Sequence, residues 1–123
     1  MKKKILVIDD EKAIRNSFVL TFEGTDCLVE TAESGIEGIE KIKKDSFNLV
    51  FLDLKMPQMD GVETLRRIRE FNKNLIIYIF TAFHRDFFVE LEKAASGGLQ
   101  FEIVQKPLDS DQLKDLVFSI LTN

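Results

Sequence analysis

Short apolar runs alternate with amphipathic segments along the whole chain, and this alternation limits the fold more than any other feature. The apolar runs have the length of buried strands and lie at 5–8, 27–31, 49–52, 75–80 and 101–104. Successive strands joined through helices run parallel, and charge-poor strands are covered on both faces. The pattern predicts an α/β fold: a doubly wound (βα)5 domain with a five-stranded parallel sheet between five helices.

The segments between and after these runs repeat apolar residues at helical spacing. The shared faces are Ile14/Phe18/Phe22, Ile36/Ile39/Ile42, Val62/Leu65/Ile68 and Leu113/Leu116/Val117/Ile120/Leu121. Three pairs resemble an N-cap with a residue that bonds back to it: Ser34 with Glu37, Asp60 with Glu63, and Asp109 with Gln112. Ser96-Gly97-Gly98 predicts a loop before the last strand.

Composition limits the size and the partners of the protein. The 123 residues include 17 Lys and Arg against 21 Asp and Glu, a formal net charge of −4. We expect one globular domain over residues 1–123, with no room for an output domain. The only basic run is Lys2 to Lys4, which argues against nucleic acid or an anionic membrane as a partner.

Apolar and cysteine residues indicate the compartment. Cys27 is the single cysteine, so we expect a small core residue in a reducing environment rather than a disulfide. The longest apolar stretch, 75–83, is about half as long as a membrane span. The apolar run after Lys4 stops at Asp9, which argues against a signal peptide. We therefore expect a cytoplasmic protein without membrane association.

Polar residues stand where the predicted strands end. Asp9 and Asp10 follow the first strand, Asp53 the third, Thr81 the fourth and Lys106 the fifth. The carboxyl ends of parallel strands form one ligand-binding edge, so these groups should converge. Crowded carboxylates repel by roughly 4 kcal/mol per pair at about 4 Å, so they need a cation. Mg²⁺, with Mn²⁺ as an alternative ion, fits oxygen ligands of this kind.

This set of groups is typical of phosphoryl transfer. A carboxylate can act as the nucleophile, while a metal, a lysine and a hydroxyl stabilise charge on the phosphoryl oxygens. A separate general base is not needed, because the carboxylate is already ionised near neutral pH.

Four motifs, taken together, resemble the receiver domain of bacterial two-component response regulators, the CheY-like family. They are residues 5–11, residues 52–61, Thr81-Ala82 and Lys106-Pro107-Leu108, and the match covers essentially the whole chain. The resemblance implies a flavodoxin-like fold and a stand-alone signalling switch rather than an enzyme acting on other substrates. A sensor histidine kinase or histidine phosphotransfer protein would pass a phosphoryl group to Asp53.

The resemblance also implies a role for each residue of the site. Asp10, Asp53 and the backbone carbonyl of Lys55 would bind Mg²⁺ directly, and Asp9 would act through water. Thr81 and Lys106 would contact the phosphoryl oxygens, and the Lys106–Pro107 bond would be cis. Phosphorylation would then repack the face of the fourth helix, fifth strand and fifth helix, which would contact a downstream protein. We expect a monomer or a weak homodimer.

Several positions depart from the family pattern or tune it. Ile103 stands where the family usually has an aromatic switch residue, and Phe101 is a candidate substitute. Lys55 and Phe83 are bulky at positions that set phosphoryl lifetime, with Ala82 beside them in the switch loop, so we expect slow self-dephosphorylation. The segment between Thr81 and Lys106 is longer than is common, with the surplus near 96–98.

Two interpretations of the predicted fourth helix and its loop remain open at this point. Phe87, Phe88, Val89 and Leu91 are either core residues with one facing water or a hydrophobic docking patch. We expect His84 to be a solvated loop residue.

Three other functions are weaker. An aspartate-nucleophile phosphatase would typically have a second Asp two residues after Asp53, where this chain has Lys55. A flavin or nucleotide binder would need a Gly-rich loop after the first strand, where Asp9-Asp10-Glu11 stands. A phosphorylation-independent interaction module with the same fold is favoured only by Ile103.

Overall fold

A computed structural model of the chain describes residues 2–83 and 85–122, and its strands form one parallel sheet. The strands are β1 (Lys3–Ile8), β2 (Cys27–Ala32), β3 (Leu49–Leu52), β4 (Ile77–Thr81) and β5 (Glu102–Gln105), in the order β2-β1-β3-β4-β5. The direction of winding reverses between β1 and β3. Such a switch point opens a crevice at the carboxyl ends of these two strands.

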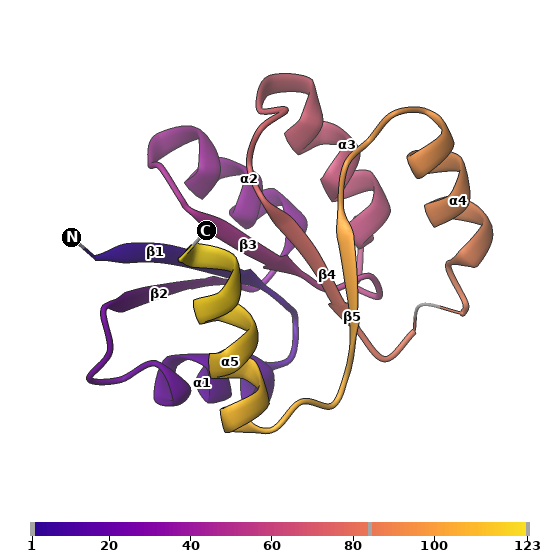
Figure 1. Cartoon of the computed structure of the whole chain (residues 1–123). Coiled ribbons are helices and arrows are strands. Elements are labelled where there is room, and N and C mark those ends of the chain that lie inside the picture. Colours follow the sequence, from indigo (N-terminus) through magenta and orange to yellow (C-terminus); the bar gives the residue numbers. More distant parts are fainter. Residues whose placement is uncertain (1, 84, 123) are drawn as a thin grey trace.

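The helices are α1 (Lys12–Thr21), α2 (Gly35–Lys44), α3 (Gly61–Phe71), α4 (Phe88–Ser96) and α5 (Ser110–Leu121). Helices α1 and α5 cover one face of the sheet, and α2, α3 and α4 cover the other (Figure 1). Each face has its own buried cluster, centred on Phe18 and Phe51 on the first face and on Leu52 and Leu65 on the second. The residues that the structure describes thus form five strands and five helices, which confirms the predicted fold class.

The last two strands begin one or two residues later than predicted. The stretch after α3 is held in a turn, because the Asn72 side chain accepts from the backbone N–H groups of Asn74 and Leu75. Before β5, the carbonyl of Gln100 accepts from the Arg69 guanidinium. Phe101 therefore precedes β5 rather than lying inside it.

Side-chain caps start three helices at the predicted residues. Ser34, Asp60 and Asp109 accept from the backbone N–H three residues later. The predicted bond back to the cap is present only for Gln112, at 3.0 Å. The prediction of such a bond is wrong for Glu37, whose side chain accepts from the N–H of Glu33, and for Glu63, whose side chain pairs with Arg67.

The predicted apolar faces of α1, α3 and α5 pack against the core, but the prediction for α2 is wrong at Ile36, which is 49% exposed. Helix α2 instead turns Gly35, Gly38 and Ile42 inward. A Cβ on Gly38 would lie 2.4 Å from Cδ1 of Ile8, so the helix packs against the sheet more closely than a side chain would allow.

Helix α4 exposes more apolar surface than the core interpretation of its sequence predicts. Leu91 is buried and Phe87 partly buried, but Phe88 is 59% and Val89 56% exposed, so two residues rather than one face water. Ser96 is the last residue of α4, and Gly97 and Gly98 form the predicted turn after it.

Other sequence predictions have mixed outcomes. Cys27 is a buried free thiol, as predicted. The prediction for His84 lies outside the described residues. Across residues 2–83 and 85–122, the helices all lack the combination of length and apolar character that a bilayer crossing requires.

Candidate functional site

The predicted site residues meet at the carboxyl edge of the sheet. Asp9 and Asp53 directly follow β1 and β3, and the ladder continues into them: the N–H of Asp9 donates to Ala32 and that of Asp53 to Ile8. The N–H of Lys106 likewise donates to the carbonyl of Thr81 at 3.0 Å. These residues are therefore held by the sheet rather than by mobile loops.

Three carboxylates form an acidic cluster in this edge. One oxygen from each of Asp9, Asp10 and Asp53 lies within 4.8 Å of the others. Asp9 and Asp53 are only 2% and 3% exposed, whereas Asp10 is exposed to solvent. Oxygen ligands at this spacing suit a hard divalent cation that keeps some of its waters.

Lys106 provides the positive charge within the cluster. Its Nζ lies 2.9 Å from Oδ2 of Asp9, 3.7 Å from Oδ1 of Asp53 and 4.0 Å from Oε1 of Glu11. The ammonium also lies 5.5 Å from the centre of the Phe80 ring. One ammonium cannot neutralise three carboxylates, so the cluster keeps a negative charge that a bound cation would offset.

The environment of Asp53 raises the pKa of its carboxyl group. Burial, and then the negative charge of Asp9, raise the pKa of Asp53 from 3.8 to about 6. Lys106, the N–H of Leu54 at 2.9 Å and the Thr81 hydroxyl oppose this rise in pKa. A second positive charge beside Asp53 would favour its ionised, nucleophilic form.

Thr81 acts on Asp53 from the end of β4, and the two bulky tuning positions, Lys55 and Phe83, stand on the loops that follow β3 and β4. Thr81 is fully buried, and its Oγ1 accepts from the N–H of Phe83 at 3.0 Å. The Nζ of Lys55 lies 4.7 Å from the centre of the Phe83 ring, so the loops after β3 and β4 touch. Ala82, between these positions, is exposed.

Sequence reasoning missed two residues that contact the cluster, Arg15 and Glu11. The Nη1 of Arg15 donates to the carbonyl of Asp9 at 2.8 Å, and its Nη2 lies 3.3 Å from Glu33. Glu11 donates its N–H to Oδ1 of Asp9 at 2.9 Å and lies within reach of Lys106. The sequence does carry a signal for both residues: Glu11 directly follows the aspartate pair, and Arg15 lies one helical turn after Glu11.

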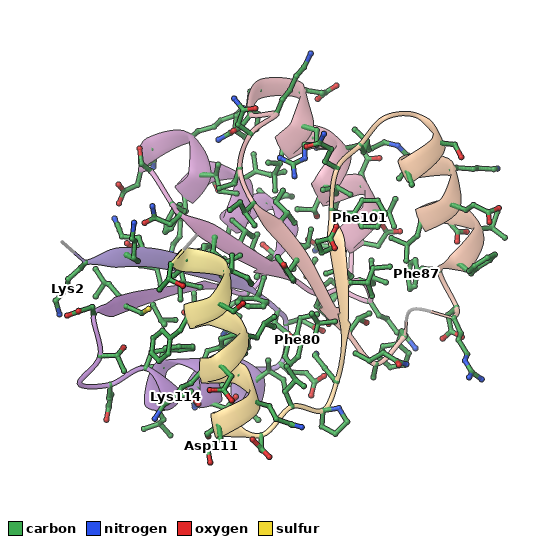
Figure 2. The ribbon with its side chains drawn as sticks, viewed as in Figure 1. Lys2, Phe80, Phe87, Phe101, Asp111 and Lys114 are labelled. Atoms are coloured by element: carbon green, nitrogen blue, oxygen red, sulfur yellow. The ribbon has the colours of Figure 1, made fainter. Side chains whose placement is uncertain are left out.

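The switch positions Phe101 and Ile103 both face the α4 side of β5, where they line one groove. Figure 2 shows Phe87 and Phe101 on the α4 side, where both pack against the core, and Phe80 on the α5 side. Ile103 is 43% exposed. A groove of about 480 Å³ is lined by Phe88, Leu91, Glu92, Ala95, Phe101, Glu102 and Ile103. The Lys106–Pro107 bond is cis, as the resemblance implies.

Fold and site together define a class: a flavodoxin-like α/β domain whose acidic cluster and lysine meet at the carboxyl edge of the sheet. The family model of the response regulator receiver domain matches residues 5–118, and the chain belongs to this family. Receiver domains are signalling switches of two-component systems and bind Mg²⁺ at an acidic pocket.

Similar proteins agree with this assignment. The chain is 38% identical to the transcriptional regulatory protein ZraR of Klebsiella oxytoca, over 89% of this chain but only 24% of that protein. It is 36% identical to the chemotaxis protein CheY of Treponema pallidum, over 96% of this chain and 82% of that protein. The solved structure of TrrA from Thermotoga maritima, in complex with Mg²⁺–BeF, is 34% identical with a TM-score of 0.78, covering 97% and 99% of the two chains.

Proposed function

We propose that the protein is a phosphorylation-dependent switch that accepts a phosphoryl group on Asp53 from the phosphohistidine of a sensor histidine kinase or a histidine phosphotransfer protein. The observation that carries this proposal is the placement of buried Asp53 between two further carboxylates and the ammonium of Lys106. A purely structural aspartate gains nothing from that arrangement, which raises its pKa.

The acidic cluster fits a divalent cation, with Mg²⁺ as the expected ion and Mn²⁺ as an alternative. We assign Asp10, Asp53 and the Lys55 carbonyl as direct ligands. Asp9 is engaged by Lys106 and by the N–H of Glu11, which supports a contact through water instead. When bound, the cation supplies positive charge that offsets the carboxylates and the charge on the phosphoryl oxygens.

The transfer step uses groups that already lie in place. An oxygen of Asp53 attacks phosphorus, the P–N bond of the phosphohistidine breaks, and its electron pair returns to the imidazole. Asp53 becomes an acyl phosphate. Lys106 Nζ, 3.7 Å from Asp53, and the buried Thr81 hydroxyl would donate to the phosphoryl oxygens.

The signal would leave through the face formed by α4, β5 and α5. This face carries exposed Phe88, Val89 and Ile103, and Phe101 connects it to the core. We propose that Phe101 performs the switch role of the aromatic residue that the family usually has at the position of Ile103. The partner that binds this face would be a downstream protein. A phosphorylation-independent module would use the same face, and the exposure of Ile103 is the observation that favours it.

Beryllofluoride binding tests this proposal, because beryllofluoride mimics a phosphoryl group on a carboxylate. We expect saturable binding, measured by fluorine NMR, that requires Mg²⁺, disappears in Asp53→Asn and weakens in Lys106→Ala. Lys114→Ala removes the same charge from α5 and should bind normally. Binding that survives in Asp53→Asn, or that needs no divalent cation, would contradict the proposal.

A further inference from the structure

A buried cation lies at the opposite edge of the sheet from Asp53. Arg69 of α3 is 6% exposed. Its Nε and Nη2 donate to the carbonyl of Gln100 at 3.1 and 2.6 Å, and its Nη1 donates to the carbonyl of Asn72 at 3.2 Å. Asn72 precedes β4 and Gln100 precedes β5, so Arg69 lies where these strands begin.

The positive charge of Arg69 has no negative partner within the described part of the chain. No carboxylate there lies within ion-pair distance of the guanidinium, although Glu102 lines a smaller neighbouring cavity of about 170 Å³ with it. A guanidinium has five N–H groups, and the bonds to Gln100 and Asn72 use three of them. A buried charge satisfied only by carbonyls leaves a strong preference for an anion.

Arg69 borders a cavity that contains a second cation. The cavity measures about 340 Å³ and is lined by Arg69, Lys73, Asn74 and residues 97–100. Its lining has no acidic side chain. Lys73 is exposed, and its ammonium forms no ion pair with any residue of 2–83 or 85–122. Two unneutralised cations therefore share one concave surface.

The turn after α4 keeps this cavity open. Gly97 and Gly98 carry no side chains, and Gly98 has a φ of 93° with open space where a Cβ would stand. The N–H groups of Gly97, Gly98 and Leu99 are bonded to carbonyls of α4, so they are not available to a ligand. The side-chain donors of the lining are those of Arg69, Lys73, Asn74 and Gln100.

We propose that this cavity binds a small phosphate dianion, either inorganic phosphate or a soluble phosphomonoester. Two cations match two negative charges, and the guanidinium and ammonium can donate to separate phosphoryl oxygens. The volume exceeds that of phosphate alone, which leaves room for an organic substituent. The site is separate from the acidic cluster and does not depend on the function proposed for Asp53.

Titration of the isotope-labelled Asp53→Asn protein in a chelating buffer tests the site, because both conditions disable the acidic cluster. Inorganic phosphate and glycerol phosphate are added at constant ionic strength, with acetate as a monoanion control. We expect saturable NMR shifts at the Arg69 Nε–H and at the amides of residues 73 and 97–100. Tighter binding of glycerol phosphate would identify the phosphomonoester as the ligand, and equal or weaker binding would identify inorganic phosphate.

Lys73→Ala should weaken phosphate binding by roughly tenfold, the scale of one charge-assisted hydrogen bond. Lys73 is exposed, so this variant should fold as the parent does. Lys12→Ala removes the same charge from the exposed start of α1, at the other edge of the sheet, and should leave affinity unchanged. Shifts that do not saturate, equal shifts with acetate, or equal losses in both variants would overturn the proposal.

Discussion

Burial and the nearby charge of Asp9 disfavour the ionised form of Asp53, and Lys106 offsets this only in part. A bound metal cation would be the second positive charge beside the carboxylate. The pKa of Asp53 in the metal-free protein, about 6, lies above the ordinary value of 3.8. Between these pH values the native protein binds more protons than the unfolded chain, so the free energy of unfolding falls as the pH rises through this window. Burial of a carboxylate for function thus lowers stability at neutral pH.

Asp53→Asn should therefore stabilise the metal-free protein. At pH 7 we expect the free energy of unfolding to rise by on the order of 2 kcal/mol, and the decline between about pH 4 and 6 to flatten. Urea denaturation in a chelating buffer across this pH range measures both effects. Asp115→Asn, at an exposed position of α5, is the control and should change little. An Asn variant that is no more stable than the parent at pH 7 would show that Asp53 is not strained by burial.

The contact between Lys55 and Phe83 gives the predicted slow self-dephosphorylation a physical form. Lys55 follows Asp53 by two residues and Phe83 follows Thr81 by two residues. Their cation–π contact joins the loops after β3 and β4, and it would limit the approach of water to a phosphoryl group on Asp53. We expect the phosphoryl group of the parent protein to persist for much longer than seconds. A half-life of seconds in the purified protein would contradict this expectation.

Lys55→Ala should shorten the half-life by roughly three- to tenfold, because it opens one side of this cover. The rate of loss of acid-labile phosphate measures the effect. Lys43→Ala provides a matched control, since the Nζ of Lys43 on α2 makes the same type of contact with the ring of Phe71 on α3, at 5.1 Å. Equal half-lives in Lys55→Ala and the parent would show that the contact between Lys55 and Phe83 does not set the phosphoryl lifetime.

At the scale of elements, the start of α3 is positioned directly against the end of β3. The N–H of Gly61 donates to the carbonyl of Leu54 at 2.8 Å. A Cβ on Gly61 would lie 2.1 Å from the carbonyl oxygen of Asp53 and 2.8 Å from the Cα of Leu54. Backbone atoms cannot rotate away, so the missing side chain lets the helix hold the loop that carries Asp53.

Gly61→Ala should thus lower the free energy of unfolding by about 2 kcal/mol or more, the scale of overpacking against rigid atoms. It should also shift the NMR signals of residues 53 and 54. Gly38→Ala is the comparison, because its Cβ would meet the flexible end of Ile8. We expect a smaller loss there, measured by denaturant unfolding. A larger loss in Gly38→Ala than in Gly61→Ala would refute this view of the α3 junction.

Local sequence patterns predicted the features that depend on contacts between residues close together in the chain, such as the helix caps. The caps at Ser34, Asp60 and Asp109 were predictable because each acceptor and its backbone donor lie within one turn. The Ile36 prediction failed because helical spacing is compatible with more than one buried face. The choice on α2 is made by Gly35 and Gly38, which contact Thr64 and Ile8 from distant elements.

At the scale of the whole molecule, the position of the site could be predicted because the topology of parallel strands brings their ends together. The sequence was therefore enough to bring together Asp9, Asp10, Asp53, Thr81 and Lys106. It was not enough to show that Lys106 pairs more closely with Asp9 than with Asp53, since that depends on side-chain geometry across β1 and β5. The sequence did not predict the role of Arg69 for the same reason, because the Gln100 carbonyl that accepts from its guanidinium lies 31 residues away along the chain.

We propose that this fold serves one chemical event, the phosphorylation of Asp53. Intact-protein mass spectrometry after incubation with acetyl phosphate tests it most directly, in the parent protein and in Asp53→Asn, with and without Mg²⁺. We predict one added phosphoryl group in the parent protein with Mg²⁺ only, and none in the variant. An unmodified parent protein, or equal modification of Asp53→Asn, would contradict the claim.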